Sequence, residues 1–294
     1  MYIFLLFANA NIMKKFNLFL IFTFIFLSAI CGIKPIFVKQ HTFAQENSEA
    51  PKVEFKTPKA SLIAIVIDDF GGYERAGVNE LLNSDIDITC AIMPFADNSQ
   101  ADYNKALENN KEVILHMPME AHVNLPQSWY GSVYIHNNDT GETAVNKLVE
   151  CLDSMPQAKG FNIHIGSGAS QNQELMQKLY EYSVENDKFF LDSRTIIGTK
   201  CKEACACANG IYLGRDVFLE PEHNKSYAGV TKQLNQAAEL AAANGYAIVI
   251  GHVGAEGGTN TARAIIDFSK TLDDSIKIVP LSDIYTLIKN QQSI

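Results

Sequence analysis

Ionisable residues end nearly every short apolar run of this sequence, and their types suit metal-assisted chemistry. The run AIVI ends on two adjacent carboxylates, Asp68 and Asp69, followed by Phe-Gly-Gly. Neighbouring side chains of a strand point to opposite faces, but where a strand runs into a loop both can turn toward the same space. The other ionisable residues that follow apolar runs are His116, His164, Asp192, Arg215, Asp216 and His252.

Three histidines with carboxylates, and no nucleophile motif, indicate a metal site. No G-x-S-x-G sequence is present, and no cysteine accompanies a histidine at the end of an apolar run. Mixed aspartate and histidine ligands suit zinc or a similar divalent ion, which polarises a carbonyl group and lowers the pKa of water. One of the adjacent aspartates would hold the metal and the other would take a proton from water, while His252 is available to protonate the leaving group.

Short apolar runs alternate with helical patterns from residue 61 onward, which predicts an α/β fold with parallel strands. The predicted strands are 62–67, 86–92, 112–115, 161–165, 188–191, 211–213, 246–250 and 276–279. The predicted helices are 74–83, 98–109, 141–154, 171–186, 228–244, 259–271 and 281–290. The alternation suits an open doubly wound sheet or a closed barrel. The barrel is favoured because the carboxyl ends of barrel strands, where the ionisable residues fall, meet at one mouth.

Two helix ends carry clear signals. Asp139, with Glu142 three residues later, predicts a capping box at the start of the helix 141–154. Gly245 predicts the end of the helix 228–244. No G-x-G-x-x-G or G-x-x-x-x-G-K-[ST] sequence follows the first predicted strand, so nucleotide binding is not supported.

The composition predicts one large folded domain over residues 60–294. The chain has 294 residues, of which 47% are hydrophobic and 19% are charged. Its formal net charge is −9, and no long basic stripe is present that could neutralise phosphates. Nucleic acid is therefore excluded as an expected partner.

The first 59 residues differ in kind from the rest. Lys14 and Lys15 precede an apolar, uncharged run at 16–33, which is typical of a secretory signal and is about long enough to span a bilayer. Residues 1–44 are therefore predicted to be a signal peptide or an N-terminal membrane anchor, and the polar residues 45–59 a linker. The folded domain is expected to be exported, either periplasmic or anchored to the outer face of the inner membrane, with no other membrane contact.

The cysteines do not form the pattern of a disulfide-rich protein of this length. Cys90 and Cys151 fall in a predicted strand and helix, where cysteine is a small buried apolar residue. Cys201, Cys205 and Cys207 lack the C-x-x-C spacing of a zinc knuckle. Inert helix packing is the favoured interpretation of this cluster, with an exported disulfide and an accessory metal or redox site as the alternatives.

Six short motifs, in order along residues 60–290, resemble the divergent polysaccharide deacetylase family, which is related to the nodulation-type carbohydrate deacetylases. They are IDDFG, LHMPME, NIHIGS, FFLDSRT, GRDVFLE and AIVIGH. The resemblance implies a deformed (β/α)7-8 barrel of the glycoside hydrolase/deacetylase type. It also implies a divalent metal, with zinc as the expected ion, and removal of an acetyl group from an envelope or extracellular glycan.

The resemblance also implies roles for single residues. Asp68 resembles the catalytic base of the family, Asp69 its metal ligand and His252 its general acid. His116 matches the histidine that begins the second motif, whose last position, a histidine in related enzymes, is Glu120 here. Either Glu120 or His164 would complete the metal site, and His164 is favoured.

The remaining predicted site residues would act around this centre. Asp192 and Arg194 are predicted to orient or tune the general acid, while Glu220 is expected to be solvated. The predicted substrate contacts are Trp129, Tyr130, Ser167, Arg215 and Asp216.

Two other functions remain open at this stage. Loss of the second motif's last histidine would suit a catalytically inactive protein that binds a glycan or a partner on the same barrel. Hydrolysis of another amide or ester, such as a peptide cross-bridge, would use the same metal chemistry.

Overall fold

The computed structural model describes residues 60–221 and 224–292, which form one compact unit. Its strands are β1 (Ser61–Phe70), β2 (Thr89–Ile92), β3 (Glu112–Met119), β4 (Gly160–Ile165), β5 (Phe189–Asp192), β6 (Leu213–Gly214), β7 (Val217–Phe218), β8 (Tyr246–His252) and β9 (Ile276–Ile278). Its α-helices are α2 (Val78–Leu82), α3 (Ser99–Glu108), α4 (Gly141–Asp153), α5 (Gln173–Glu185), α6 (Cys201–Cys207), α7 (Tyr227–Asn244), α8 (Gly258–Ser269) and α9 (Leu281–Gln292). Two short 3-10 helices are η1 (Gln127–Trp129) and η2 (Ala169–Gln171).

A single parallel sheet organises the molecule, in the order β6-β5-β4-β3-β2-β1-β8-β7. The last strand, β9, pairs with the start of β1, on residues Ser61 to Ile63, whereas β2 pairs with its second half. The sheet curls into an incomplete barrel, and within the described residues no strand pairing joins β6 to β7. The predicted α/β fold, a deformed barrel, is confirmed.

The strands form because their side chains alternate between two apolar environments. In β1, Ile63, Ile65 and Ile67 belong to the outer core, which the surrounding helices cover, whereas Ala64 and Val66 belong to the inner core. Both sets are fully buried. A strand with two buried faces reads as a continuous apolar run, as the sequence from residue 62 does.

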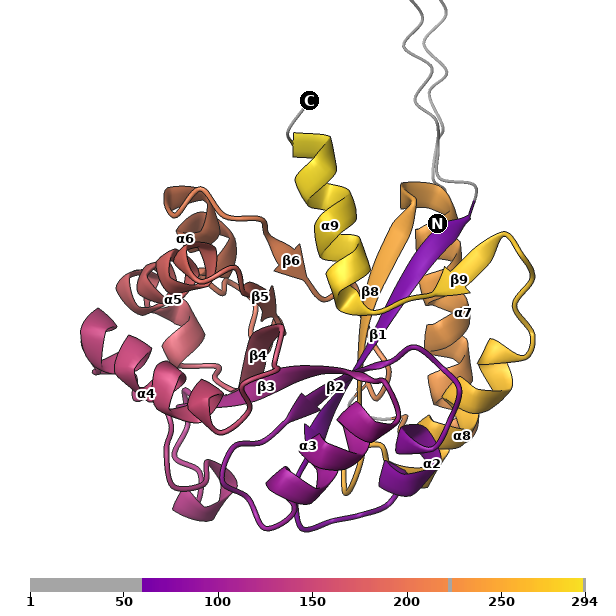
Figure 1. Cartoon of the computed structure of the whole chain (residues 1–294), viewed down its shortest axis with the longest axis horizontal. Helices are drawn as coiled ribbons and strands as arrows, with labels where there is room; N and C mark the ends of the chain where they lie inside the picture. The colour runs from indigo at the N-terminus through magenta and orange to yellow at the C-terminus, as the bar shows by residue number, and fades with distance from the viewer. Residues whose placement is uncertain (1–59, 222–223, 293–294) are drawn as a thin grey trace, which may run out of the picture. The chain divides into compact units, whose positions relative to one another are not determined.

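Helix α9 fills the interior of the curled sheet at the amino ends of the strands. Leu281 and Ile284 pack within the inner core. The backbone N–H of Leu281 donates to Oγ1 of Thr89 (3.0 Å), at the first residue of β2. In Figure 1, α9 lies at the centre of the view, and the helices from α2 to α8 lie around the outside of the sheet. The carboxyl ends of the strands are thus the end of the barrel that α9 leaves open.

Several sequence predictions need correction. The strand β7 was not predicted because it has two residues. The helix α6 is absent from the predicted helix ranges, although the favoured interpretation of the cysteine cluster placed its residues in a helix. Helix α4 is capped by Thr140, whose Oγ1 accepts from the backbone N–H of Thr143, and not by Asp139. Gly245 ends α7 in the left-handed conformation, at φ 89°, as predicted.

The cysteine cluster lies in α6 as free thiols. Cys201 and Cys205 are buried, and Sγ of Cys201 lies 3.5 Å from Sδ of Met176. Cys207 is exposed. No disulfide joins cysteines within the part of the chain that the structure describes. The cluster therefore packs α6 against α5, as the favoured interpretation predicted.

The N-terminal predictions, a signal or anchor at 1–44 and a linker at 45–59, lie outside the described residues. Among the helices that are described, none combines the length and the apolar character that crossing a bilayer requires.

Candidate metal centre and active site

The site begins where the apolar interior of the barrel ends. In β1 the inward positions are Ala64, Val66 and then Asp68, two residues apart. In β8 the inward residue Ile250 is followed two residues later by His252. Asp68 and His252 are partners in the register of β1 and β8. Asp68 and His252 are therefore the first polar residues beyond the inner core on their strands, and they lie side by side.

A bulge turns Asp69 toward the same space. Ile67 is paired with Cys90 and Phe70 with Ile92, so two residues of β1 lie opposite one residue of β2. Asp69 adopts φ 69°, in the left-handed region that aspartate tolerates better than most residues. Consecutive aspartates can therefore share one site.

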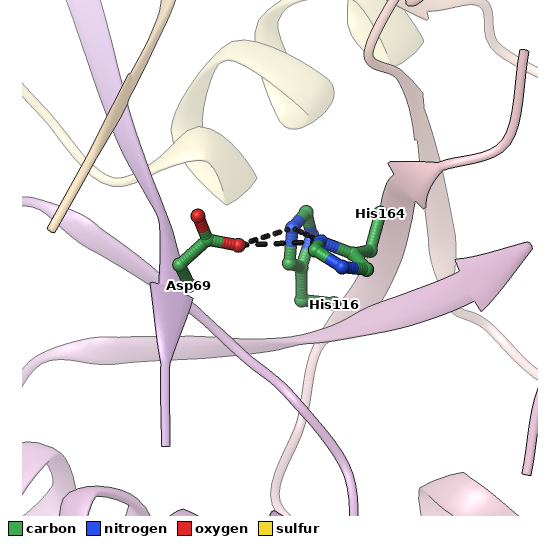
Figure 2. A group of neighbouring side chains, drawn as sticks. All are labelled: Asp69, His116 and His164. Carbon is green, nitrogen blue, oxygen red and sulfur yellow. Dashed lines mark hydrogen bonds and ion pairs between the residues drawn. The ribbon is translucent and has the colours of Figure 1, made fainter. Parts of the chain in front are cut away.

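Asp69, His116 and His164 meet at the open end of the barrel, from β1, β3 and β4 (Figure 2). Oδ1 of Asp69 lies 3.4 Å from Nε2 of His116 and 3.2 Å from Nδ1 of His164. The two facing imidazole nitrogens are 3.0 Å apart. A tetrahedral zinc ion, with bonds of about 2.0–2.2 Å, spaces its ligands by about 3.3–3.5 Å. The three atoms therefore have nearly the spacing of a zinc ligand set.

Hydrogen bonds on the outer side of each ring fix which nitrogen faces inward. Nε2 of His164 lies 3.1 Å from the carbonyl oxygen of Trp129, which only accepts, so Nε2 carries the proton. Nδ1 of His116 lies 2.7 Å from Oδ1 of Asn162 and donates to it. In neutral imidazoles the inner nitrogens then present lone pairs toward the Asp69 carboxylate. Three acceptors this close repel one another unless a proton or a metal cation lies between them, and hydrogen bonds on the outer nitrogens are typical of metal-ligating histidines.

Charge in the site supports the same interpretation. Burial alone would raise the pKa of Asp69, but the His116 and His164 imidazoles hold it well below its ordinary value. Burial would lower the pKa of His116, but the Asp68 and Asp69 carboxylates more than offset this and raise it. The ligand carboxylate is thus ionised, and the surrounding negative charge favours a bound cation.

Asn162, which the sequence prediction missed, links the metal ligands to Asp68. Its side chain is fully buried and donates from Nδ2 to Oδ1 of Asp68 (2.7 Å), while its Oδ1 accepts from His116. Burial raises the pKa of Asp68 above its ordinary value, although His116, His252 and Asn162 oppose the shift. Oδ2 of Asp68 receives no such bond and faces Nε2 of His252 at 4.0 Å. That oxygen is the one available to accept a proton.

The partner of His252 is Glu220, not Asp192. Oε2 of Glu220 lies 3.0 Å from Nδ1 of His252, and Oε1 accepts from the backbone N–H of His252 (3.1 Å) and from the hydroxyl of Thr261. Glu220 is 1% exposed, so the prediction that it is solvated is wrong. Burial lowers the pKa of His252, but the bond to Glu220 and the nearby carboxylates raise it to about 9. His252 is therefore protonated at neutral pH, with Nε2 directed toward Asp68.

Comparison with known proteins identifies the family. The model of the family described as divergent polysaccharide deacetylase matches residues 65–285. This chain belongs to that family.

Two proteins are similar to this chain in sequence. The chain is 32% identical over 193 residues to the uncharacterized protein YibQ of Escherichia coli K12, covering 66% of this chain and 59% of YibQ. It is 29% identical over 231 residues to an uncharacterized protein of Haemophilus influenzae, covering 76% of this chain and 77% of that protein. The chain thus spans under two thirds of the length of YibQ.

Solved structures share the fold. The uncharacterized protein ATU2773 from Agrobacterium tumefaciens superposes with a TM-score of 0.67 at 17% identity, over 77% of this chain and 90% of that one. A lactam utilization protein from Thermus thermophilus superposes with a TM-score of 0.50 at 11% identity, over 76% of this chain and 99% of that one.

Glu120 lies apart from the Asp69–His116–His164 cluster in this member of the divergent polysaccharide deacetylase family. Its Oε2 accepts from the backbone N–H of Asn137 (2.6 Å) and lies 3.8 Å from Nδ1 of His136. Of the two alternatives, the structure places His164, not Glu120, beside Asp69 and His116.

Asp192 and Asp216, which were predicted to act around His252, accept hydrogen bonds from other groups instead. Asp192 is fully buried and accepts from the backbone N–H of Arg194 (2.9 Å) and from the hydroxyl of Tyr212 (2.8 Å). Asp216 accepts from the backbone N–H of Ile248 (2.9 Å). Neither aspartate contacts His252, whose hydrogen-bond partner is Glu220, so Asp192 does not orient the imidazole directly.

The predicted substrate contacts divide into exposed and packed residues. Trp129 is 56% exposed beside the metal centre, where its carbonyl group holds His164. Tyr130 is buried, stacks on Tyr134 and accepts from the backbone N–H of Ala121, so it has no free ring face for a sugar and that prediction is wrong. Oγ of Ser167 accepts from the backbone N–H of His122.

The loop that follows Asp69 is held by a buried carboxylate. Asp102 of α3 accepts from the backbone N–H of Gly71 (2.7 Å) and pairs through both oxygens with Arg75. Asn98 adds a bond from its Nδ2 to the carbonyl of Gly72 (3.0 Å). These bonds limit the freedom of the backbone immediately after the proposed metal ligand, as a preorganised site requires.

Proposed function

We propose that this protein is an exported, metal-dependent carbohydrate deacetylase that hydrolyses acetyl groups, chiefly N-acetyl groups, of an envelope or extracellular glycan. The observation that carries the proposal is the meeting of Asp69, His116 and His164 between a buried carboxylate and a protonated imidazole. The family assignment supports the substrate class. Zinc is the proposed ion because the donors are one carboxylate and two imidazoles.

Different residues of the chain bind the metal, accept the proton of water and position the base. A divalent ion held by the three ligands supplies a Lewis acid that polarises the acyl carbonyl and lowers the pKa of water. Oδ2 of Asp68 accepts the proton of the attacking water, and its raised pKa makes it a stronger base than an ordinary aspartate. Asn162 holds the other oxygen, so the carboxylate does not rotate.

His252 acts on the leaving group. Its Nε2, directed toward Asp68, gives a proton to the amine nitrogen as the C–N bond breaks, so that acetate and a free amine leave. Glu220 stabilises the protonated form through Nδ1 and fixes the plane of the ring. Oδ2 of Asp68 and Nε2 of His252 lie 4.0 Å apart, so base and acid can both reach one bound acyl group.

The alternative of an inactive glycan- or partner-binding protein rested on the missing second-motif histidine. His164 offers an imidazole in its place, so that observation no longer favours inactivity. The decisive experiment measures zinc in the purified chain and acetate release from a panel of acetylated oligosaccharides and acetylated peptides. Zinc with acetate release from sugars supports the proposal. Acetate from peptides alone would favour the other amide hydrolysis, and glycan binding without zinc or acetate would favour the inactive alternative.

Export is proposed from the charged start and apolar run that precede the folded domain. In cells that make the full chain, the domain is expected in the periplasm or on the outer face of the inner membrane. Protease added to spheroplasts should degrade an anchored domain, whereas osmotic shock should release a cleaved one. A domain that resists the added protease and is also retained after osmotic shock would contradict export.

Glu220→Gln is expected to shift the alkaline limb of the kcat/KM profile to lower pH by one to two units. Burial lowers the pKa of His252, but the Glu220 hydrogen bond, together with the charges of Asp69, Glu220 and Asp68, raises it to about 9, so a neutral amide at position 220 removes part of that rise. Because the protonated imidazole is the acid, activity is present below the pKa and lost as pH rises through it. The stability that this pair contributes has the same sign, complete below about pH 6.5 and lost as pH rises through about 9.

The control for this variant is Glu150→Gln, which removes an exposed carboxylate of α4 with the same change of charge. Its profile should coincide with that of the wild type. An unchanged alkaline limb in Glu220→Gln, with zinc retained, would show that Glu220 does not tune the acid.

A further inference from the structure

Two arginines lie together beside the site, and neither pairs with a carboxylate of the described residues. Arg194 follows β5 and Arg215 follows β6, two strands paired in parallel. Nη1 of Arg194 donates to the carbonyl of Arg215 (2.7 Å), and Nη2 of Arg215 donates to the carbonyl of Arg194 (2.9 Å). Nε of Arg215 donates to the carbonyl of Ser193 (2.8 Å). Each arginine therefore holds the loop that carries the other.

The charge of this pair is not neutralised by any carboxylate in the part of the chain that the structure describes. Across residues 60–221 and 224–292, no carboxylate oxygen lies within 4.0 Å of either guanidinium group. The nearby acids already accept other donors, Asp192 from Tyr212 and Asp216 from Ile248. Burial and the adjacent Arg194 charge lower the pKa of Arg215. Two like charges held this closely gain from a bound anion.

The backbone is built for this arrangement. Arg194 adopts φ 49°, a left-handed conformation that is uncommon for a long side chain, and its N–H is held by Oδ1 of Asp192. The Arg194 side chain crosses Gly214, where a Cβ atom would lie 2.8 Å from Nη2 and 2.9 Å from Nε. Residues that their surroundings hold in such a conformation cluster at functional sites.

The pair lies within reach of a molecule bound at the active site. Cζ of Arg215 is 4.9 Å from the centre of the Phe218 ring, and that ring is 5.1 Å from the His252 ring. These two distances limit the separation of the guanidinium from the imidazole to about 10 Å. Nη2 of Arg194 and Nη1 of Arg215 make no hydrogen bond within the described residues, so both can receive a ligand.

We propose that Arg194 and Arg215 form an anion subsite that binds a carboxylate carried by the glycan next to the sugar that is deacetylated. The proposal rests on the proposed deacetylase function and narrows its substrate to an acidic, acetylated glycan. The planar guanidinium group suits a carboxylate because its parallel N–H donors match the two carboxylate oxygens.

The test compares two acetylated tetrasaccharides of equal length with the full chain loaded with zinc. The chain that is wild type at both arginines and its arginine variants all carry Asp68→Asn, so that neither probe is hydrolysed during the titration. One is neutral, and the other carries a lactyl ether carboxylate on every second sugar. Isothermal calorimetry is expected to give about tenfold tighter binding of the acidic probe at low salt. Arg194→Gln should remove most of that preference. The charge-matched control Arg263→Gln, on the exposed surface of α8, should retain it.

Equal affinities of the wild type for the two probes would overturn the subsite, and so would an equal loss for both probes in Arg194→Gln. If Arg194→Gln does not fold, the test uses the wild type at low salt and at about 0.5 M salt. High salt should reduce its preference for the acidic probe, and an unchanged preference would overturn the subsite. A third tetrasaccharide carries a sulfate group in place of each lactyl carboxylate. If it binds as tightly as the acidic probe, the subsite is not selective for a carboxylate. Absence of acetate release would count against the deacetylase function only, since the affinity ratio is measured without turnover.

Discussion

Asp68→Asn is expected to lower kcat for acetate release by about two to four orders of magnitude, which is the usual contribution of a positioned general base. The amide keeps the size of the side chain, and its oxygen can still accept from Nδ2 of Asn162. It cannot take a proton from water. The zinc content of the variant should equal that of the wild type, because Asp68 is not among the three atoms of the metal centre.

The kinetic signature separates this variant from a binding defect. KM should change little, since the lost interaction develops in the transition state. A control change at Asp97, an exposed residue of the β2–α3 loop, to asparagine should leave both kcat and zinc content unchanged. Wild-type turnover in zinc-loaded Asp68→Asn would remove Asp68 from the mechanism.

Asp69→Asn, the same change one residue later, is expected to abolish stoichiometric zinc binding and with it acetate release. It replaces the only anionic ligand of the centre by a neutral amide. Zinc at about one hundred times its dissociation constant should stabilise the wild type by about 2.7 kcal/mol. In a domain of this size that corresponds to a rise in Tm of about 5–10 °C. The variant should show no rise.

Metal analysis after dialysis and thermal melts with and without zinc measure this effect. Asp68→Asn serves as the matched control, because it removes the adjacent charge and should keep both the zinc and the rise in Tm. Zinc retention by Asp69→Asn, together with an unchanged rise in Tm, would show that the ion binds elsewhere. The contrast between neighbouring aspartates tests the division of roles directly.

The sequence predicts the barrel and most of its site because one local rule produces both. Inward positions recur every two residues, and the apolar series in each strand gives way to a polar residue at the open end, as Val66 gives way to Asp68 and Ile250 to His252. Such a change is visible without knowing which strands are neighbours. The parallel arrangement then brings the strand ends together.

The rest of the site depends on contacts between distant segments. Asn162 is an amide inside an apolar run, and only the register of β3 and β4 reveals that it faces His116. Glu220 follows the run Val-Phe-Leu, the same signal that located the other residues, but the strand before it has two residues and was not recognised. The burial of Tyr130 depends on Tyr134 and on the packing of the whole loop.

The position of α9 has a consequence for biosynthesis. The inner faces of the strands remain open to water until a segment that is translated after all of them has been made, because Leu281 and Ile284 complete that core. A nascent chain that ends before this helix exposes aliphatic side chains and unpaired strand edges, which are the features that promote aggregation. The folding chain is therefore expected to need protection from aggregation until α9 has been made.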